Sequence, residues 1–233
     1  MGKSASQRQG GGTWVVIPAY NEARAIAGVV AAALSTGHNV MVVDDGSTDT
    51  TAEVAGRAGA IVLRHPVNLG QGAALQTGMT YALMLKADSI VTFDADGQHR
   101  ADDIAGLLDA LAAHGADFAL GSRFLGETRD IPTSRRCLLQ LATWFTRVTT
   151  GLAVTDAHNG LRAMTRRGAS RIKLRQNRMA HASEILDQIA SSGLKYVEVP
   201  VTIEYSAYSR GKGQRSSAAV NILLDLFTRK LHQ

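Results

Sequence analysis

The chain of 233 residues has a single cysteine, Cys137, only four prolines and only 5% aromatic residues. One cysteine cannot close an intramolecular disulfide and has no CxxC partner for zinc, so we expect a protein of the reducing cytosol. No apolar run reaches the roughly 18 residues of a membrane-spanning helix. The N-terminal segment MGKSASQRQGGG also lacks the apolar core of a signal peptide. The sequence therefore excludes a disulfide-rich protein and predicts no membrane span.

Hydrophobic residues make up 45% of the chain and charged residues 19%, which is typical of a folded globular domain. The net charge of +5 is unevenly distributed. Residues 1–120 hold 7 basic and 12 acidic residues (net −5), whereas residues 121–233 hold 18 and 8 (net +10). An acidic region suits a metal ion, and a basic region suits phosphates or an anionic membrane surface. Few aromatic residues and the lack of a recognised binding motif argue against nucleic acid as the partner.

Short β-rich runs alternate with Ala- and Leu-rich helical stretches between Thr13 and Gly121. We expect buried strands at Trp14–Ile17, Val40–Val43, Ile61–Leu63, Ile90–Phe93 and Phe118–Leu120. We expect the intervening helices at Glu22–Ser35, Thr48–Ala58, Gln71–Lys86 and Ala101–His114. This alternation predicts an α/β fold with a mainly parallel sheet flanked by helices, whose ligands lie beyond the carboxyl ends of the strands.

The pattern changes after Gly121. An amphipathic stretch and a loop lead to a basic segment, a further helix and a strand pair, before a Gly/Lys/Arg loop and a last amphipathic helix. These elements are expected at Cys137–Thr150, Thr155–Asn159, Arg162–Arg178, His181–Ser192, Val197–Val199 with Val201–Tyr205, Ser209–Ser216 and Ala218–Leu231. The predicted organisation is a flexible N-terminus at 1–12, one domain at 13–215 and a C-terminal amphipathic helix at 216–233.

The sharpest chemical signal is the segment Phe93–His99, FDADGQH, at the end of an apolar run. Asp94 and Asp96 stand at positions i and i+2, so they project the same way while the backbone stays extended. With the Gln98 amide oxygen they form a set of hard ligands for Mg²⁺ or Mn²⁺. Such a cation would neutralise a diphosphate and stabilise its charge as it leaves. The alternative interpretation is a solvated acidic turn that caps the next helix.

Two further polar loops follow predicted strands. In VVDDGSTD, Asp45 offers an acceptor to the base or ribose of a nucleotide, while the following serine or threonine caps the next helix. In IPAYNE, Pro18 stiffens the strand exit, Tyr20 offers a ring to a base or ribose, and Glu22 offers an acceptor. Turn or cap roles explain the IPAYNE residues equally well when each is taken singly. No GxGxxG follows the first strand, which argues against a NAD-dependent dehydrogenase.

In combination these segments resemble the family 2, GT-A-type inverting glycosyltransferases, and specifically the subgroup of dolichyl- and polyprenyl-phosphate sugar synthases. The resemblance runs from about Thr13 to Leu231. It rests on the ordered motifs IPAYNE, VDDGSTD, NLGQGAAL, DADGQH, GSRF, DAHNGLRA and VEVPV. It implies the GT-A fold, a Rossmann-like mixed sheet, and a hexosyltransferase that uses a nucleotide-sugar.

The resemblance also implies roles for individual residues. Those matching the nucleoside-holding positions are Pro18, Tyr20, Glu22, Val43 and Asp45, and those matching the diphosphate and metal positions are Asp94, Ala95 and Asp96. Asp96 and Gln98 match direct metal ligands, and Asp94 shares that role.

Basic residues of the second half complete the implied site. Arg123 and Arg162 resemble arginines that meet phosphate groups, and Arg210 and Lys212 resemble the basic residues of a loop that closes over the donor. In that loop Arg215 is an alternative to Lys212, because SRGKGQR fits two registers.

The implied reaction is metal-dependent transfer of a sugar from a UDP- or GDP-linked donor to a polyprenyl phosphate on the cytoplasmic membrane face. A lipid phosphate is already an anion near neutral pH and needs no general base. Arginines and a cation would bring two repelling phosphates together for in-line attack on the anomeric carbon.

Departures from the motif leave other functions open. His158 and Asn159 stand where the prenyl-phosphate enzymes usually have small residues, and Leu161 where they usually have an aromatic. An alternative acceptor is therefore a sugar hydroxyl of a growing cell-envelope glycan, with Glu184 as the general base. A second alternative is a non-catalytic nucleotide-sugar-binding protein. We expect His99, His158 and His181 to be loop or surface residues.

Membrane contact is expected from the two amphipathic stretches. Cys137–Thr150 and Ala218–Leu231 are flanked by arginines and a lysine, so they could rest on a membrane or pack against a small membrane-protein partner. Ordinary helices with one face on the core are the alternative, and self-association stays open. The expected location is peripheral, on the inner face of the membrane.

Overall fold

The computed structural model describes residues 11–126, 128–129, 133–175 and 181–204. The expected basic loop with Arg210 and Lys212, and the expected C-terminal helix, lie outside the described residues. The domain boundaries therefore stay predictions.

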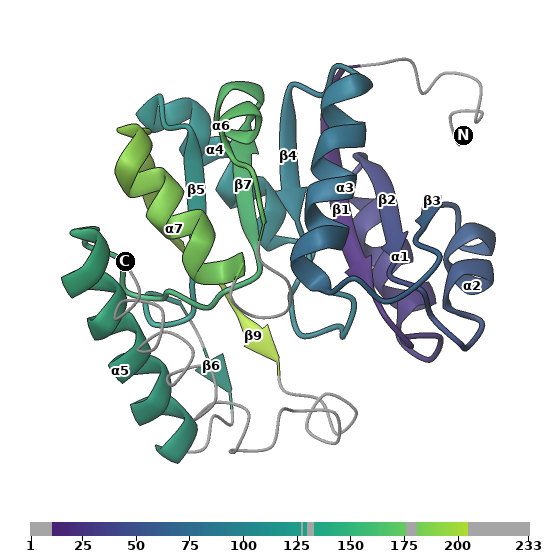
Figure 1. Ribbon diagram of the computed structural model, residues 1–233, viewed down its shortest axis with the longest axis horizontal. Coiled ribbons are helices and arrows are strands. Elements are labelled where there is room, and N and C mark those ends of the chain that lie inside the picture. The colour runs from purple at the N-terminus through teal and green to yellow at the C-terminus, as the bar shows by residue number, and fades with distance from the viewer. Residues whose placement is uncertain (1–10, 127, 130–132, 176–180, 205–233) are drawn as a thin grey trace.

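A seven-stranded sheet forms the centre of the protein (Figure 1). Its strand order is β3-β2-β1-β4-β7-β5-β8, and β7 runs antiparallel to both of its neighbours, whereas the other pairings are parallel. The strands are β1 (Thr13–Ala19), β2 (Asn39–Asp44), β3 (Ile61–Arg64), β4 (Ser89–Thr92), β5 (Phe118–Ser122), β7 (Arg162–Thr165) and β8 (Tyr196–Pro200). The predicted mainly parallel α/β sheet is confirmed.

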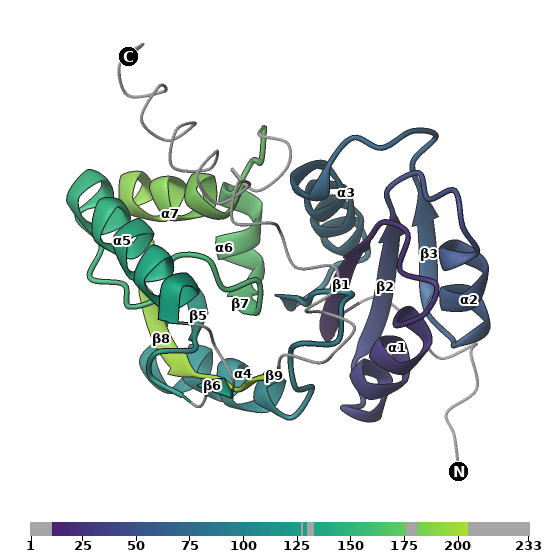
Figure 2. The same cartoon turned by 90° about the horizontal axis from the view of Figure 1, so that it is seen from below.

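Helices cover both faces of this sheet (Figure 2). One face carries α1 (Ile26–Ser35), α2 (Thr51–Arg57) and α4 (Asp103–His114). The opposite face carries α3 (Gln71–Met84), α6 (Arg166–Arg171) and α7 (His181–Ser192). The long helix α5 (Thr133–Thr150) packs against α7 and lies farther from the sheet, at the left of Figure 1.

The interiors of β1 and β2 are apolar because both faces of these strands are buried. Val15 of β1 and Val42 of β2 belong to the core under α1, α2 and α4. Their neighbours Val16 and Val43 belong to the second core, under α3, α6 and α7. Successive side chains of a strand point to opposite faces, so one valine-rich run supplies both cores.

Two expectations for the second half of the chain are corrected. The basic segment after Arg162 contains β7 and α6, which its charges concealed. The expected strand pair is wrong, because β8 pairs with β5 while β9 (Ile203–Glu204) pairs with β6 (Thr128–Arg129). The Val201 N–H donates to the Ser122 carbonyl at 3.1 Å, so the chain keeps following the strand beside it and makes no hairpin.

Helix α3 approaches the sheet closely at Gly78. A Cβ atom at this position would lie 2.3 Å from Val16 Cγ1 and 3.1 Å from Val43 Cγ2. Both valines are fully buried and have stiff side chains, so they cannot move aside without strain. The close approach therefore requires glycine although glycine weakens a helix.

We predict that Gly78→Ala lowers the free energy of unfolding by about 1–3 kcal/mol, the usual cost of overpacking. Gly28→Ala is the matched control, because Gly28 also lies within a helix but has no atom within 4 Å of the added Cβ. The control should raise stability by about 0.5–1 kcal/mol. Urea unfolding followed by circular dichroism measures both, and equal effects would contradict the packing argument.

Candidate active site

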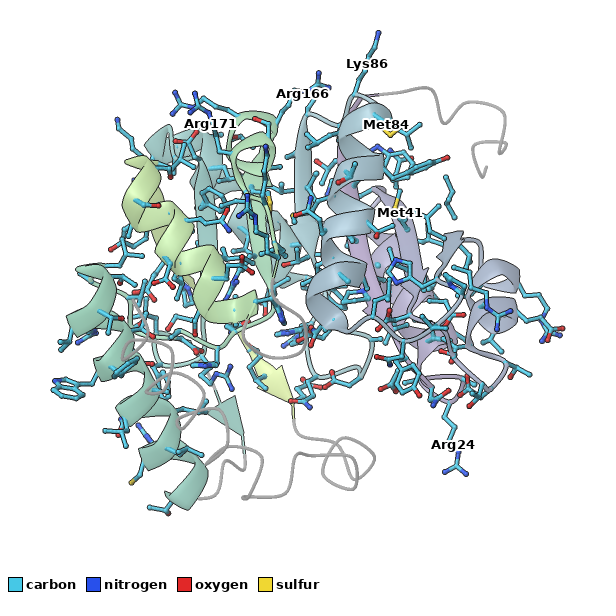
Figure 3. The ribbon with its side chains drawn as sticks, in the orientation of Figure 1. Arg24, Met41, Met84, Lys86, Arg166 and Arg171 are labelled. Atoms are coloured by element: carbon cyan, nitrogen blue, oxygen red, sulfur yellow. The ribbon has the colours of Figure 1, made fainter. Side chains whose placement is uncertain are left out.

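The three polar loops predicted to hold the donor meet at one edge of the sheet. β1 pairs in parallel with β2 and with β4, and Ala19 lies opposite Asp44 at the carboxyl ends. Figure 3 shows Arg24, which follows β1, at this edge, whereas Lys86 and Arg166 project from the opposite edge. Parallel pairing therefore brings the loops after β1, β2 and β4 together.

Hydrogen bonds lock the loops after β1 and β2 to each other. The Asn21 N–H donates to Ser47 Oγ at 2.9 Å, and the Thr48 N–H donates to Asn21 Oδ1 at 2.9 Å. The Glu22 N–H donates to Thr51 Oγ1 at 2.8 Å. This network fixes the shape of the edge before any ligand arrives.

The predicted nucleoside residues take different positions in this edge. Pro18 and Val43 are buried partners in the β1–β2 register, and Glu22 is half-buried. Tyr20 is 44% exposed, so its ring is available to stack on a base or ribose. The structure thus brings these residues together, and their contact with a nucleoside stays a prediction.

Asp45 is buried and holds the loop that enters α3. Its Oδ1 accepts the Leu69 N–H at 2.9 Å and lies 2.7 Å from His65 Nδ1, while its Oδ2 accepts the Gly70 N–H at 2.7 Å. His65 Nε2 in turn lies 2.9 Å from Thr77 Oγ1. Both carboxylate oxygens therefore already have partners in the protein. A direct bond from Asp45 to a nucleotide stays a prediction.

Asp94 and Asp96 lie just beyond the end of β4. The strand ends at Thr92 and residues 95–96 form a turn, so the extended backbone expected here is wrong. The two carboxylates nevertheless act on each other. Burial and, second, the charge of Asp94 together raise the pKa of Asp96 to about 6, against the lowering effect of a hydrogen bond from the Gln98 backbone.

Asp94 keeps its charge because of the groups around it. Burial acts to raise its pKa, but the hydrogen bond and charge of His99, with His181 and Arg162, lower it overall. His99 Nε2 lies 3.0 Å from Asp94 Oδ2, and Gln71 Nε2 donates to Asp94 Oδ1 at 3.2 Å. Neither Gln71 nor His99 was predicted as a site residue.

The two carboxylates fit a divalent cation. Their mutual repulsion, seen in the raised pKa of Asp96, is what a bound cation relieves. Gln98 donates its Nε2 to Asp96 Oδ2 at 2.7 Å, which places its amide group beside the same carboxylate. In the described part of the chain no three His, Cys, Asp or Glu side chains form a metal-binding group, so the remaining ligands would come from Gln98, substrate and water. Ala95, between them, is buried.

A buried ion pair anchors Arg123. Its Nε donates to Asp156 Oδ2 at 2.6 Å, and its guanidinium also donates to the His158 carbonyl at 2.9 Å. The Asp156 N–H is held by Glu198 Oε1 at 3.2 Å. Asp156 stood in a recognised motif but carried no predicted role, because an ion partner 33 residues away has no signal in the sequence.

Arg162 opens β7 and is 4% exposed. It pairs with Thr92, the last residue of β4, and with Leu120, the middle residue of β5, so it lies at the carboxyl end of β4. Burial lowers its pKa to about 10, although Asp156 and Asp94 act to raise it. Its guanidinium donates to the carbonyls of Ala157 and Ala182 at 3.2 and 3.4 Å, and it stays charged. A buried cation that lacks a close carboxylate among the described residues suits an anionic ligand.

Gly160, two residues before Arg162, packs against the Asp94 carboxylate. A Cβ atom on Gly160 would lie 2.3 Å from Asp94 Oδ2, and the Gly160 carbonyl accepts the Thr92 hydroxyl at 2.7 Å. The loop before β7 therefore passes directly over the Asp94 carboxylate.

Glu184, expected as a general base, and the three histidines lie in surroundings that the sequence did not predict. The Glu184 carboxylate accepts the Arg175 N–H at 3.0 and 3.1 Å, which gives it a structural partner. Its role as a general base stays a prediction. Of the three histidines expected to be loop or surface residues, His99 and His158 lie in loops, although the His99 side chain is 4% exposed and the ring nitrogens of His158 are buried. The expectation is wrong for His181, which is the first residue of α7 and is 5% exposed.

Comparisons with known proteins identify the family of the chain. The chain matches the sequence profile of Glycosyl transferase family 2 over residues 14–172. UDP-N-acetylglucosamine–dolichyl-phosphate N-acetylglucosaminyltransferase of Methanococcus voltae is 30% identical over 240 residues, covering 94% of this chain and 96% of that protein. Polyprenol monophosphomannose synthase of Mycolicibacterium smegmatis is 33% identical over 204 residues, covering 82% of this chain and 76% of that protein.

Solved structures show the same fold. Glucosyl-3-phosphoglycerate synthase of M. tuberculosis has a TM-score of 0.68 and 20% identity, over 94% of this chain and 80% of that chain. The mostly parallel α/β sheet flanked by helices is thus of the GT-A type. The chain belongs to glycosyltransferase family 2 and is a glycosyltransferase.

We predict that Asp96→Asn stabilises the protein without metal. A pKa raised to about 6 means that the folded protein takes up a proton as pH falls from about 6 to 4, before the unfolded chain does. The Asp96 carboxylate therefore costs stability as pH rises through this range, and its removal should add about 1–3 kcal/mol at pH 7.5.

Urea unfolding in a chelator, from about pH 4 to 7.5, measures the effect. The gain should shrink towards pH 4. Asp109→Asn on the exposed face of α4 is the control and should change little. A variant no more stable than the wild type at pH 7.5 would refute the electrostatic argument.

Proposed function

We propose that this protein transfers a sugar, with inversion, from a UDP- or GDP-linked donor to a polyprenyl phosphate in a metal-dependent reaction. The observation that carries the proposal is the meeting of buried Arg123 and Arg162 with Asp94 and Asp96 at one edge of the sheet. Relatives named for dolichyl phosphate and for polyprenol monophosphomannose support the choice of acceptor.

The chemistry of a lipid phosphate matches these residues. Its oxygen is an anion at neutral pH, so the attack on the anomeric carbon requires no general base. Two phosphate groups must instead be held close together against their repulsion. Arg123 is rigid because Asp156 fixes it, and Arg162 is buried with its charge only partly compensated, so both are suited to orient an acceptor phosphate. A single in-line displacement inverts the anomeric centre.

The carboxylates would serve the donor. Asp94 and Asp96, with Gln98, would hold Mg²⁺ or Mn²⁺, and the bound ion would neutralise the diphosphate leaving group. Solved structures of glucosyl-3-phosphoglycerate synthase contain Mn²⁺ or Mg²⁺ with UDP, which supports this assignment. Pro18, Tyr20, Glu22, Val43 and Asp45 would surround the nucleoside. Arg210 and Lys212 would close over the donor.

Helix α5 supports a peripheral location on a membrane. Leu141, Trp144 and Val148 are 50%, 59% and 64% exposed, whereas the face turned to the protein carries buried Thr143 and Thr146. Leu138, Leu139 and Phe145 are half-buried, so the helix carries large apolar side chains on its outer face in addition to those turned towards the protein.

Two exposed arginines, Arg136 and Arg147, accompany this apolar face of α5, and cations beside apolar groups favour an anionic lipid surface. Among the helices that the structure describes, none is long and apolar enough to cross a bilayer. We place the protein on the cytoplasmic face of the membrane, where a small membrane protein is an additional candidate partner.

We predict that purified protein forms a glycolipid from undecaprenyl phosphate and UDP-N-acetylglucosamine or GDP-mannose with Mn²⁺, and that a chelator stops the reaction. Arg162→Lys should lower kcat/KM by about 100-fold, because a lysine cannot reproduce the planar contacts of an arginine. Arg166→Lys, at the opposite edge of the sheet, should have little effect. Radiolabelled product is measured by thin-layer chromatography, and no product with any UDP-, GDP- or dTDP-sugar would overturn the proposal.

We predict that the double variant Leu141→Glu/Trp144→Glu loses most of its binding to vesicles of phosphatidylglycerol and phosphatidylcholine. The matched control is Met84→Glu, because Met84 is an apolar residue that is 72% exposed on a different helix, α3. Co-sedimentation compares the three proteins. Equal sedimentation of the wild type and the double variant would exclude α5 as the membrane contact.

A further inference from the structure

Two neighbouring residues beside the proposed active site carry buried polar atoms without partners. Among the described residues, both ring nitrogens of His158 and the Nδ2 of Asn159 have no hydrogen-bond partner. Asn159 is only 2% exposed. Its Oδ1 accepts the Leu161 N–H at 3.0 Å, which fixes the orientation of the amide and leaves Nδ2 as the unpaired end. Buried polar groups are almost always paired, so this pair requires an explanation.

Contacts on either side of His158 and Asn159 show where these two residues lie. The next residue, Gly160, packs against the Asp94 carboxylate, where the donor diphosphate is proposed to bind. On the other side, Arg123 donates to the His158 carbonyl at 2.9 Å, and Arg123 and Arg162 are both close enough to act on the His158 ring. His158 and Asn159 therefore lie along the chain between the contact with Asp94, proposed for the donor diphosphate, and the contact with Arg123, proposed for the acceptor phosphate. In an in-line transfer, that is where the sugar itself must lie.

The charge state of His158 indicates which chemical groups of a ligand it can bind. Burial lowers its pKa to about 4, and Arg162, Arg123 and His181 lower it as well, against the opposing charge of Asp156. The imidazole is thus neutral at pH 7, with one N–H donor and one nitrogen acceptor, and the Asn159 Nδ2 adds two donors. Phosphate oxygens of a dianion only accept hydrogen bonds and would leave the imidazole acceptor unpaired. Hydroxyl groups both donate and accept, so they match the pair.

We propose that His158 and Asn159 bind hydroxyl groups of the transferred sugar and contribute to the choice of donor. This inference rests on the proposed function, because it places the sugar between the two phosphate sites. It also accounts for unpaired groups in this part of the protein, since they become paired when the donor binds.

The test compares the affinity for a nucleotide-sugar with that for the nucleotide alone. Isothermal titration with Mn²⁺ gives Kd values for UDP-N-acetylglucosamine and UDP, and for GDP-mannose and GDP. In His158→Leu and in Asn159→Leu, the advantage of the preferred nucleotide-sugar over its nucleotide should fall about 10-fold, with the nucleotide affinity unchanged. His158→Asn keeps a donor and an acceptor and should restore part of the loss.

Controls separate this role from a structural one. His114→Ala removes a histidine from the last turn of α4 and should leave the ratio unchanged. His158→Leu should melt at or above the wild-type temperature, because an apolar side chain replaces an unpaired polar one. Asn159→Leu also removes the acceptor of the Leu161 N–H and should melt at a lower temperature. A lower melting temperature of His158→Leu with weaker binding of UDP and GDP themselves would indicate a structural role and overturn the inference.

Two further results would also overturn it. One is that both leucine variants keep the wild-type ratio of nucleotide-sugar affinity to nucleotide affinity, or that this ratio is already one in the wild type. The other is a raised KM for undecaprenyl phosphate without a change in the donor ratio, which would assign the pair to the acceptor phosphate. A wild-type protein that binds nucleotide-sugars through His158 but forms no glycolipid would refute the proposed function and leave this inference intact.

Discussion

The antiparallel pairing of β7 with β4 and β5 is the constraint on which the candidate site depends. A parallel strand at this place would enter the sheet from the far edge and would put Arg162 about 10 Å or more from the carboxylates, given a rise of about 3.3 Å per residue. Because β7 runs the other way, its first residue lies beside Thr92 at the carboxyl end of β4 and beside Leu120 in the middle of β5. The loop before it then crosses the same edge and brings Gly160 onto Asp94.

The electrostatics of the site follow from this arrangement. An acidic first half and a basic second half meet where the sheet joins them, so buried charges of both signs lie close together. Asp156 stabilises Arg123 directly, whereas Arg162 has backbone carbonyls and more distant carboxylates around it. Moving a charge out of water costs free energy unless an opposite charge pairs with it. Arg162 is only partly paired within the protein, so a bound anionic ligand would complete its pairing.

Much of the first half could be predicted from the sequence. Valine-rich runs bounded by turns located β1 and β2, because strands buried on both faces are apolar along most of their length. The short apolar run of β3 was also located, although this strand is only half-buried. The three loops after β1, β2 and β4 were also predictable, because parallel strands end at the same edge. Helix starts were less accurate: α1 begins at Ile26, since residues 20–25 are held in the loop network with Ser47 and Thr51.

The second half was predicted less well for a physical reason. β7 has four residues and starts with a buried arginine, so neither its length nor its pattern indicates a central strand. The partners Asp156 for Arg123 and His99 for Asp94 depend on tertiary packing. The outward apolar face of α5 could not be predicted either, because the amphipathic pattern does not say which side meets the protein.

The late position of β7 in the chain has a consequence for folding. β1 to β4 are complete once residue 92 has been made, but the free edge of β4 stays unpaired until residues 162–165 arrive. An open strand edge is a template for pairing with other chains. During synthesis the first half therefore passes through a stage in which it is compact but prone to association. β7 ends this stage by pairing with β4, and β7 also carries Arg162. The same pairing therefore covers the open side of β4 and completes the candidate site.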